Sequence, residues 1–353
     1  MVIVRAPVRI SFGGGGTDLA AYYTHFGGFV VSTAITRYCY AIADHSAVGG
    51  ISINSADYRI LERYPRGVIP AVEGPLALPK AAIAWFANRG ICEKGVNLFL
   101  ASEVLPGTGL GSSSAMAVAL LQALSTYVGE PMGNTGVAEL ACWLEIERLG
   151  MPIGKQDQYA SACGGLNTIE FTVDGVRVTP LELPADVVSE LSSHLLLFST
   201  AQTHNSAAIL CQLQADTQTK PKTTKSLHRI KTLAREMREA LIAEDLDHFG
   251  RLLDLGWREK RSLSKRISTA AIDCWYSAAR KAGALGGKIV GAGGGGFLLL
   301  YCPAHRQEVV RETMTHFGLQ EMTFDFDFTG ARVLAAYEDG TSKGYQLSHM
   351  RQQ

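Results

Sequence analysis

Hydrophobic and polar residues alternate along several short stretches of the chain, and this pattern predicts β-strands. The first stretch, residues 2–12, ends at the glycines of positions 13–16, which predict a tight turn. The second stretch, residues 28–44, is rich in β-branched and aromatic residues and predicts a pair of strands. The last contains Asp174 and Gly175, a dipeptide typical of hairpin turns. The predicted strands and hairpin cover residues 2–12, 28–44, 96–104 and 166–183.

Other stretches have the spacing of amphipathic helices. We expect Thr135 to cap the helix that runs to Gly150, and the polar residues 217–226 to form a loop. Strands and helices interleave without strict alternation, which favours an α+β protein with two lobes, residues 1–184 and 185–353. The predicted helices cover residues 79–90, 114–128, 135–150, 205–215, 225–244, 269–283 and 304–317.

Composition narrows the class of protein. The 353 residues include 33 basic and 33 acidic side chains, so neither nucleic acid nor an anionic membrane is expected as a partner. The apolar runs are too short to span a bilayer, and the N-terminus does not resemble a signal peptide. The seven cysteines form no C-x-x-C pair, which predicts free thiols in the cytoplasm. The nine histidines lack the spacing of a metal site.

Three glycine-rich segments each lie at the end of a predicted strand: "RAPVRISFGGGGTDL" (5–19), "PGTGLGSSSA" (106–115) and "GAGGGGF" (291–297). In the second, a strand, a glycine loop and a helix follow one another. The first amides of a helix lack intrahelical partners and carry partial positive charge, so this segment is suited to bind a diphosphate. A plain helix start with a flexible lead-in is the alternative.

The third glycine segment fits G-x-G-x-x-G through Gly291, Gly293 and Gly296. A dinucleotide-binding loop must open a helix, whereas here the strand-like "FLLLY" follows. A tight hairpin between buried strands is therefore the alternative interpretation. The Gly-Lys pairs at 154–155 and 287–288 lack the Ser or Thr of a Walker A loop.

Several charged residues are candidates for chemistry. Asp157, in "GKQDQ", either points into a cleft as a proton acceptor or faces solvent on a turn. Glu145 and Glu147 lie at opposite margins of an apolar helical stripe, and either can ligate Mg²⁺. Asp18 is a turn residue or a substrate ligand. Arg9, within a strand, is expected to have a phosphate or a carboxylate as its partner.

Taken together, these segments resemble the GHMP kinases, the family of the galactokinases and the homoserine, mevalonate and phosphomevalonate kinases. "PGTGLGSSSA" is similar to the phosphate loop P-x-x-x-G-L-G-S-S-A, except that Pro106 stands one residue closer to Gly-Leu-Gly. "APVRISFGGGGTD" is similar to the galactokinase motif A-P-G-R-x-N-x-x-G-E-H-T-D. Gly15 and Gly16 replace its E and H, so those sugar contacts are not implied.

A third motif, "GMPIGKQDQ", resembles the galactokinase "GMPCGIMDQ". In that branch the metal-binding glutamate and the aspartate have a spacing similar to that of Glu145 and Asp157, so the resemblance favours Glu145 over Glu147.

The resemblance implies a ribosomal-S5-like N-terminal lobe and a ferredoxin-like C-terminal lobe, with ATP and a sugar phosphate bound in the cleft between them. It implies that Asp157 and Arg9 are catalytic and that Ser113 and Glu145 hold Mg²⁺. It leaves a homodimer open. The implied ATP-binding residues are Pro106, Gly107, Thr108, Gly109, Leu110, Gly111, Ser112, Ser113 and Ser114. The implied substrate-binding residues are Gly14, Gly15, Thr17, Asp18, Asp157, Gln158, Gly293 and Gly294.

Within the family, "GGGGTDL", "GKQDQYASACGGLN" and "GGKIVGAGGGGF" look most like the D-glycero-D-manno-heptose 7-phosphate 1-kinases. This implies transfer of phosphate from ATP to the anomeric C1 hydroxyl, giving the 1,7-bisphosphate. The alternatives are a fucose- or galactose-type sugar 1-kinase and a non-catalytic sugar sensor. The third glycine segment is expected to let the C-terminal lobe approach the phosphate loop. Lys288 is either a contact for the 7-phosphate or a surface lysine.

Overall fold

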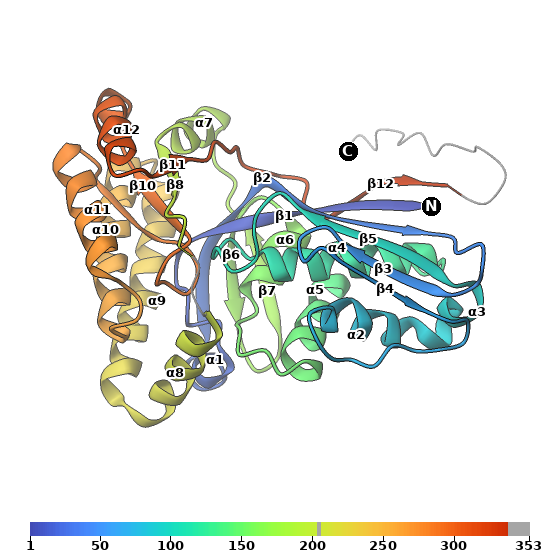
Figure 1. Cartoon of the computed structure of the whole chain (residues 1–353). Coiled ribbons are helices and arrows are strands. Elements are labelled where there is room, and N and C mark those ends of the chain that lie inside the picture. Colours follow the sequence, from blue (N-terminus) through green and yellow to red (C-terminus); the bar gives the residue numbers. More distant parts are fainter. Residues whose placement is uncertain (203–205, 338–353) are drawn as a thin grey trace.

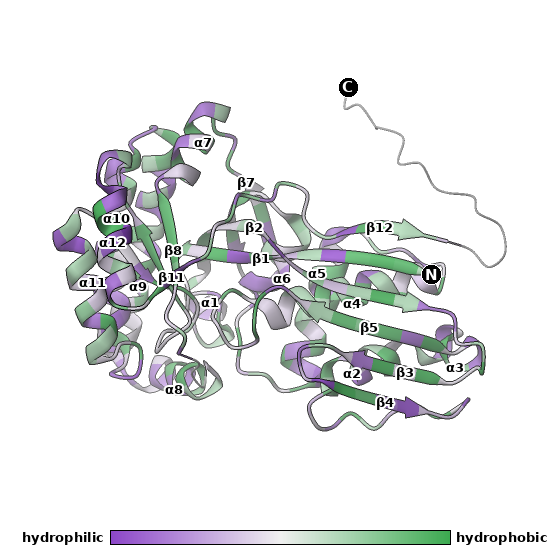
Figure 2. Cartoon of the chain, turned by 45° about the horizontal axis from the view of Figure 1, so that its top comes forward, coloured by the Kyte–Doolittle hydropathy of each residue, from purple (hydrophilic) through white to green (hydrophobic). Residues whose placement is uncertain are grey.

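The computed structural model describes residues 1–202 and 206–337, which form two lobes of mixed strands and helices (Figure 1). The prediction of a two-lobed α+β protein is confirmed. Hydrophobic residues concentrate on the strands, and hydrophilic residues are frequent on the helices at the surface (Figure 2). Within the described ranges, no helix has the length and apolar character needed to cross a membrane.

The first lobe is built on a sheet that has eight strands in the described residues. Its main path runs β12-β1-β2-β5-β3-β4, and β6 pairs with β2 and β7. Only β3 and β5 are parallel among these described pairs. The hairpin β6–β7 confirms the prediction for residues 166–183. The strands are β1 (Val2–Gly13), β2 (Gly28–Asp44), β3 (Ile51–Ser55), β4 (Ile60–Tyr64), β5 (Val96–Ser102), β6 (Leu166–Phe171), β7 (Val176–Pro180) and β12 (Arg332–Ala336).

Strand β2 corrects one prediction, because residues 28–44 form a single long strand and not two paired strands. Residues 28–33 pair with β6 and residues 39–44 pair with β5. The opposite edge of β2 follows β1. Between its ends, β2 has no glycine, proline, asparagine or aspartate to reverse the chain, so a β-rich composition extends the strand without a turn.

Helices cover the sheet of the first lobe. Helix α4 is rich in Ala and Leu, which favours a helix, and most of its side chains are buried against the sheet. Helix α5 follows Gly133, so Thr135 does not cap it, and the chain then continues as a π-helical segment, Trp143–Arg148. The helices of this lobe are α1 (Ala20–Phe26), α2 (Ala77–Phe86), α3 (Ile91–Lys94), α4 (Ser112–Tyr127), α5 (Asn134–Cys142) and α6 (Gln156–Cys163).

The second lobe has an antiparallel sheet in the order β11-β8-β10-β9. Its strands are β8 (Leu195–Ser199), β9 (Gly286–Ile289), β10 (Phe297–Tyr301) and β11 (Gln320–Glu321). Its helices are α7 (Ala185–Ser193), α8 (Ser206–Thr219), α9 (Pro221–Ile242), α10 (Leu246–Leu263), α11 (Ala270–Ala282) and α12 (Gln307–His316). Short 3₁₀ segments span Ala87–Arg89 and Ala304–Arg306.

The loop predicted at residues 217–226 is not present, because only Lys220 separates α8 from α9. Pro221 occupies the first turn of α9, where a missing N–H costs no helical hydrogen bond. Polar composition therefore misled the prediction, since most of these polar side chains lie on helix surface that is exposed or partly exposed, and only Thr217 and Thr223 are buried.

The two lobes share an apolar core and a strand. The end of β1 extends into the second lobe, where the rings of Phe12 and Phe249 are in edge contact with centroids 5.3 Å apart. Strand β12 crosses back and pairs with β1, with Val2 opposite Ala336. Residues late in the sequence thus complete the first sheet, and the division of the chain at residue 184 stays a prediction.

Candidate active site

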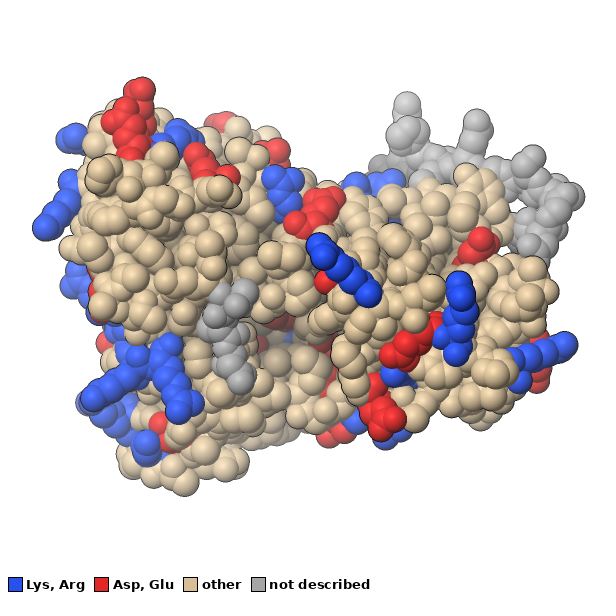
Figure 3. Space-filling view, viewed as in Figure 1, with Lys and Arg blue, Asp and Glu red and all other residues tan. Residues whose placement is uncertain are grey.

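A cavity of about 410 Å³ brings together residues of both lobes, within the usual size range of small-molecule sites. All three glycine segments reach it, together with the chain before α6 and the facing helices α8 and α10. The surface is hollowed between the lobes, and charged residues of both signs are interspersed on this face (Figure 3).

The second glycine segment ends at Gly111, whose left-handed backbone (φ +77°) turns the chain into α4. Among the described residues, no side chain caps the start of α4. The first amides of α4 therefore have no capping side chain beside the cavity, which is the arrangement that binds phosphate at helix N-termini. The members of this segment that line the cavity are Pro106, Gly107, Gly109, Gly111, Ser112, Ser113 and Ser114.

The third glycine segment is a hairpin between the buried strands β9 and β10, so the interpretation as a hairpin is confirmed. It packs directly on the second glycine segment. A Cβ on Gly109 would lie 2.4 Å from the carbonyl oxygen of Val290, and one on Gly296 would lie 2.1 Å from that of Thr108. The expectation that glycines let the C-terminal lobe approach the second glycine segment is confirmed, because a side chain at either position would separate the two loops.

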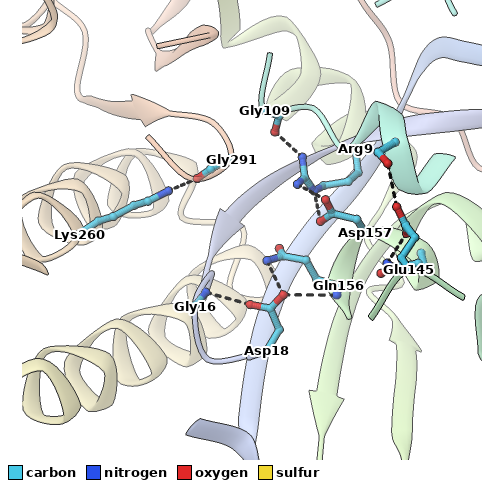
Figure 4. Close-up of polar contacts among 11 residues, drawn as sticks. Arg9, Gly16, Asp18, Gly109, Glu145, Gln156, Asp157, Lys260 and Gly291 are labelled. Atoms are coloured by element: carbon cyan, nitrogen blue, oxygen red, sulfur yellow. Dashed lines mark hydrogen bonds and ion pairs between the residues drawn. The ribbon is translucent and has the colours of Figure 1, made fainter. Parts of the chain in front are cut away.

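Arg9 and Asp157, which both line the cavity, form a two-pronged ion pair (Figure 4). Arg9 Nε donates to Asp157 Oδ1 at 2.8 Å, and Nη2 donates to Oδ2 at 2.6 Å. Arg9 Nη1 donates to the carbonyl oxygen of Gly109 at 2.6 Å, which holds the guanidinium against the second glycine segment. The carboxylate interpretation of Arg9's partner is thus confirmed, and Asp157 faces the cavity at the start of α6.

Asp18 lies beside this pair and is also buried. Its Oδ1 accepts from the amide of Gly16 at 2.9 Å, and its Oδ2 accepts from Gln156 Nε2 at 2.9 Å. Burial raises the pKa of Asp18, and the nearby charge of Asp157 raises it further, whereas hydrogen bonds from Gly16 and Gln156 lower it. Two carboxylates with different surroundings therefore face one cavity.

Glu145 lies behind the start of α4, and Glu147 is exposed. Ser113 Oγ donates to Glu145 Oε1 at 2.8 Å, and Gln158 Nε2 donates to Oε2 at 2.6 Å. The π-helical segment that contains Glu145 is a local widening of the helix, a feature often found at functional sites. Burial raises the pKa of Glu145 to about 7, against hydrogen bonds from Ser114, Ser113 and Gln158 that lower it.

The oxygen donors at Ser113 and Glu145 fit Mg²⁺, which prefers a few protein oxygens together with substrate phosphates and water. Glu145 is a fully buried carboxylate with no cationic partner among the described residues, and burial without a counter-charge explains its raised pKa. Within those residues no group of three or more His, Cys, Asp or Glu side chains is placed to hold a metal on its own. The site thus suits a cation that arrives with a nucleotide.

Two lysines of the second lobe complete the cavity wall. Lys260 of α10 is half-buried and donates to the carbonyl oxygen of Gly291 (Figure 4). Burial and the charge of Arg9 lower the pKa of Lys260 to about 8, although Asp18 opposes the shift. Lys288 is buried, so it is not a surface lysine. It donates to the carbonyl oxygens of Ser11 and Phe12 at 2.7 and 3.1 Å. Burial lowers the pKa of Lys288 well below its usual range, and the charges of Lys260 and Arg9 add to this.

Several residues expected at the site lie outside the cavity lining. Thr17 Oγ1 donates to the carbonyl oxygens of Gly14 and Phe29, which holds the turn of the first glycine segment. Gln158 is committed to Glu145, and Gly294 donates its amide to Ile267 at 2.8 Å. The predicted residues that do not line the cavity are Gly14, Thr17, Thr108, Leu110, Glu145, Gln158, Gly293 and Gly294.

Sequence reasoning also missed polar residues that do line the cavity, among them Ser11, Gln156 and Lys260. Gln156 is adjacent to Asp157, and Ser11 lies two residues beyond Arg9, so proximity to a candidate residue was the available signal. Lys260 had no such signal, because it is one of several basic residues on a long amphipathic helix.

Comparisons with known proteins agree with this geometry. The N-terminal domain of the GHMP kinases matches residues 77–165, and the C-terminal domain of the GHMP kinases matches residues 237–318. The chain is 29% identical over 331 residues to a D-glycero-alpha-D-manno-heptose 7-phosphate kinase of Campylobacter jejuni, covering 92% of this chain and 96% of that protein.

Two solved structures share the architecture. One is a D-glycero-D-manno-heptose 1-phosphate kinase from Bacteroides thetaiotaomicron, with a TM-score of 0.80 and 28% identity over 96% of this chain and all of that one. The other is a putative sugar kinase from Campylobacter jejuni, with a TM-score of 0.77 and 27% identity over 94% of this chain and 97% of that one. Matches to both family domains, together with these full-length likenesses, show that the chain belongs to the GHMP kinase family.

Proposed function

We propose that the protein transfers the γ-phosphate of ATP to the anomeric C1 hydroxyl of D-glycero-D-manno-heptose 7-phosphate. The observation that carries the proposal is the meeting, in one cavity, of the start of α4 with the Arg9–Asp157 pair and Asp18. Amides at a helix start suit a nucleotide's phosphates, and carboxylates across the cavity suit an acceptor hydroxyl. The heptose comes from the names of the similar proteins.

Phosphoryl transfer has a loose transition state, so placement and charge stabilisation carry most of the catalysis. In the proposed mechanism Gly107, Gly109 and Gly111 let the backbone approach the phosphates. Arg9, fixed by three hydrogen bonds, stabilises the negative charge of the group in transit.

Asp157 orients the acceptor hydroxyl in this mechanism and takes its proton late. Both of its oxygens accept from the Arg9 guanidinium, which holds the carboxylate in one orientation. Orientation therefore contributes more than early proton removal. Asp18 accepts a hydrogen bond from another part of the acceptor.

Ser113 and Glu145 are the proposed protein ligands of Mg²⁺. When bound with ATP, this ion would neutralise part of the negative charge of the nucleotide's phosphates. Ser113 presents its hydroxyl from the start of α4, and Glu145 is held behind it by Gln158. ATP as donor and reduced thiols at all seven cysteines fit a cytoplasmic enzyme.

A 6-deoxy aldose such as fucose is the second candidate acceptor. It is favoured by an apolar wall on the C-terminal side of the cavity, which suits a methyl group better than a phosphate. Lys260, on the same side, favours the phosphorylated heptose, because its ammonium can pair with an anion. The apolar residues of this wall are Ile209, Leu210, Leu213, Leu263 and Ile267.

A coupled ADP-release assay tests the proposal with heptose 7-phosphate, mannose, fucose and galactose, each with and without Mg²⁺. We expect heptose 7-phosphate to give the highest kcat/KM, and phosphorus NMR of the product to show a new anomeric phosphate. A higher kcat/KM for fucose would select the second candidate. ADP release that is independent of any acceptor would overturn both.

A further inference from the structure

Two buried polar atoms in the cavity have no hydrogen-bond partner among the described residues: Ser11 Oγ and Gln156 Oε1. Ser11 is 4% exposed and Gln156 is 9% exposed, so bulk solvent does not readily satisfy either atom. Buried polar groups in folded proteins are nearly always paired, and an unpaired one at a ligand cavity therefore points to a missing partner.

The orientation of the Gln156 amide is fixed by its neighbour. Its Nε2 and its backbone N both approach Asp18 Oδ2, at 2.9 and 3.4 Å. A carboxylate accepts hydrogen bonds, so the amide nitrogen must face Asp18 and Oε1 must point away from it. Asp18 is itself held by the amide of Gly16. The unpaired Oε1 is therefore a hydrogen-bond acceptor that is held in one orientation.

Gly15 lies between the two side chains. A Cβ at this position would be 3.7 Å from Gln156 Nε2 and 3.8 Å from Ser11 Oγ. The absence of a side chain leaves open a volume that borders Ser11 Oγ and the amide of Gln156, whose nearest atom to it is Nε2. Ser11 can donate its hydroxyl hydrogen and Gln156 Oε1 can accept one, so an alcohol group, which both donates and accepts, has the chemistry to pair with both atoms.

We propose that Ser11 and Gln156 bind one hydroxyl of the acceptor sugar, a neighbour of the hydroxyl that is phosphorylated, and that Gly15 keeps the space for it. The assignment rests on the proposed function, because it places the acceptor beside Asp18 and Asp157. The proposed contact would select one class of substrate, a polyol with a free second hydroxyl. Gly15 therefore contributes through the space it leaves, in place of the side-chain sugar contact that the galactokinase motif would supply.

Ser11→Ala removes only the hydroxyl oxygen, and Gly15→Ala fills the open volume. The backbone of Gly15 is outside the left-handed region and its Cβ meets nothing closer than 3.7 Å, so the alanine fits without strain. We expect each variant to lower kcat/KM for the acceptor about 10- to 100-fold, with KM for ATP unchanged. Gly136→Ala in α5, far along the chain and outside the cavity, is the matched control and should match wild type.

Monodeoxy analogues of the best acceptor identify the hydroxyl. For wild type, one analogue should lose about 10- to 100-fold in kcat/KM. For Ser11→Ala that same analogue should lose less than threefold, because the partner has already been removed. Equal losses for wild type and Ser11→Ala with every analogue would overturn the assignment, as would unchanged acceptor kinetics in both Ser11→Ala and Gly15→Ala.

Calorimetric titration of the acceptors without ATP separates the two proposals. If no aldose is phosphorylated but one binds in a manner that weakens with Ser11→Ala, the hydroxyl site stands and the proposed kinase activity fails. If an aldose is phosphorylated and its affinity is the same in wild type, Ser11→Ala and Gly15→Ala, the proposed kinase activity stands and the hydroxyl site fails. Absence of both binding and turnover for every aldose overturns both.

Discussion

Replacing Lys260 by Met is expected to stabilise the fold while it impairs the proposed catalysis. Lys260 brings a charge into a half-buried position near Arg9, and the described residues give its ammonium a carbonyl partner but no ion pair. Met has a similar length and no charge, so it keeps the packing of the stem and removes the cost of placing a cation there.

The magnitude follows from the pKa of Lys260, which falls from 10.5 to about 8 on folding. Each unit of difference in pKa is about 1.4 kcal/mol, so the shift corresponds to about 3 kcal/mol of destabilisation when the group is charged in both states. Partial exposure to solvent screens the charge, and we expect about 2 kcal/mol.

The sign depends on pH. Below about pH 8 the lysine is protonated in both states, and the folded state carries the full penalty. Between about pH 8 and 10.5 the unfolded chain holds more protons than the folded chain, so the stability of wild type rises with pH and the penalty disappears. The advantage of Lys260→Met should therefore be largest at pH 7 and shrink as the pH approaches 10.

Urea unfolding of wild type and Lys260→Met at pH 7 and pH 9.5 measures this difference, with Lys265→Met, an exposed lysine, as the control. In parallel, the ADP-release assay should show lower kcat/KM for Lys260→Met. A variant that is less stable than wild type at pH 7, or whose stability difference is the same at both pH values, would refute the reasoning that burial and Arg9 destabilise the charged form of Lys260.

Three further outcomes are expected. Asp157→Asn should lower kcat about 10²- to 10⁴-fold in the ADP-release assay while KM for ATP stays near wild type; turnover near wild type would remove Asp157 from the mechanism. Gly109→Ala should lower stability by about 1–3 kcal/mol in thermal unfolding, because it needs a φ of +88° and its Cβ would meet Val290, whereas Gly107→Ala has open space and should cost about 1 kcal/mol. Glu145→Gln should weaken calorimetric binding of a non-hydrolysable ATP analogue about tenfold or more with Mg²⁺ and little without it; an equal effect in both conditions would argue against a metal ligand.

The sequence predicts the parts of the site that depend on local order. A strand, a glycine loop and an Ala-rich helix follow one another within about 30 residues, so the start of α4 could be located without a structure. The hairpin of the third glycine segment is similarly local, because "FLLLY" cannot open a helix that binds a dinucleotide.

The remaining parts depend on which distant segments meet. Glu145 and Glu147 are equivalent by helical periodicity, and a π-helical widening that periodicity does not show accompanies the inward turn of Glu145. Lys260 reaches the cavity only because α10 packs beside the glycine hairpin. The free acceptor of Gln156 exists because Asp18, 138 residues away in sequence, fixes the other end of the amide.

The return of β12 to β1 has a consequence for synthesis on the ribosome. Val2 is translated before its partner Ala336, which follows only after both lobes have been translated. Until then β1 has an unpaired edge, and such edges readily join strands of other chains. Nascent molecules are thus exposed to mispairing along this edge of β1 until β12 has been translated, and shielding by a chaperone during that interval is expected to raise their yield.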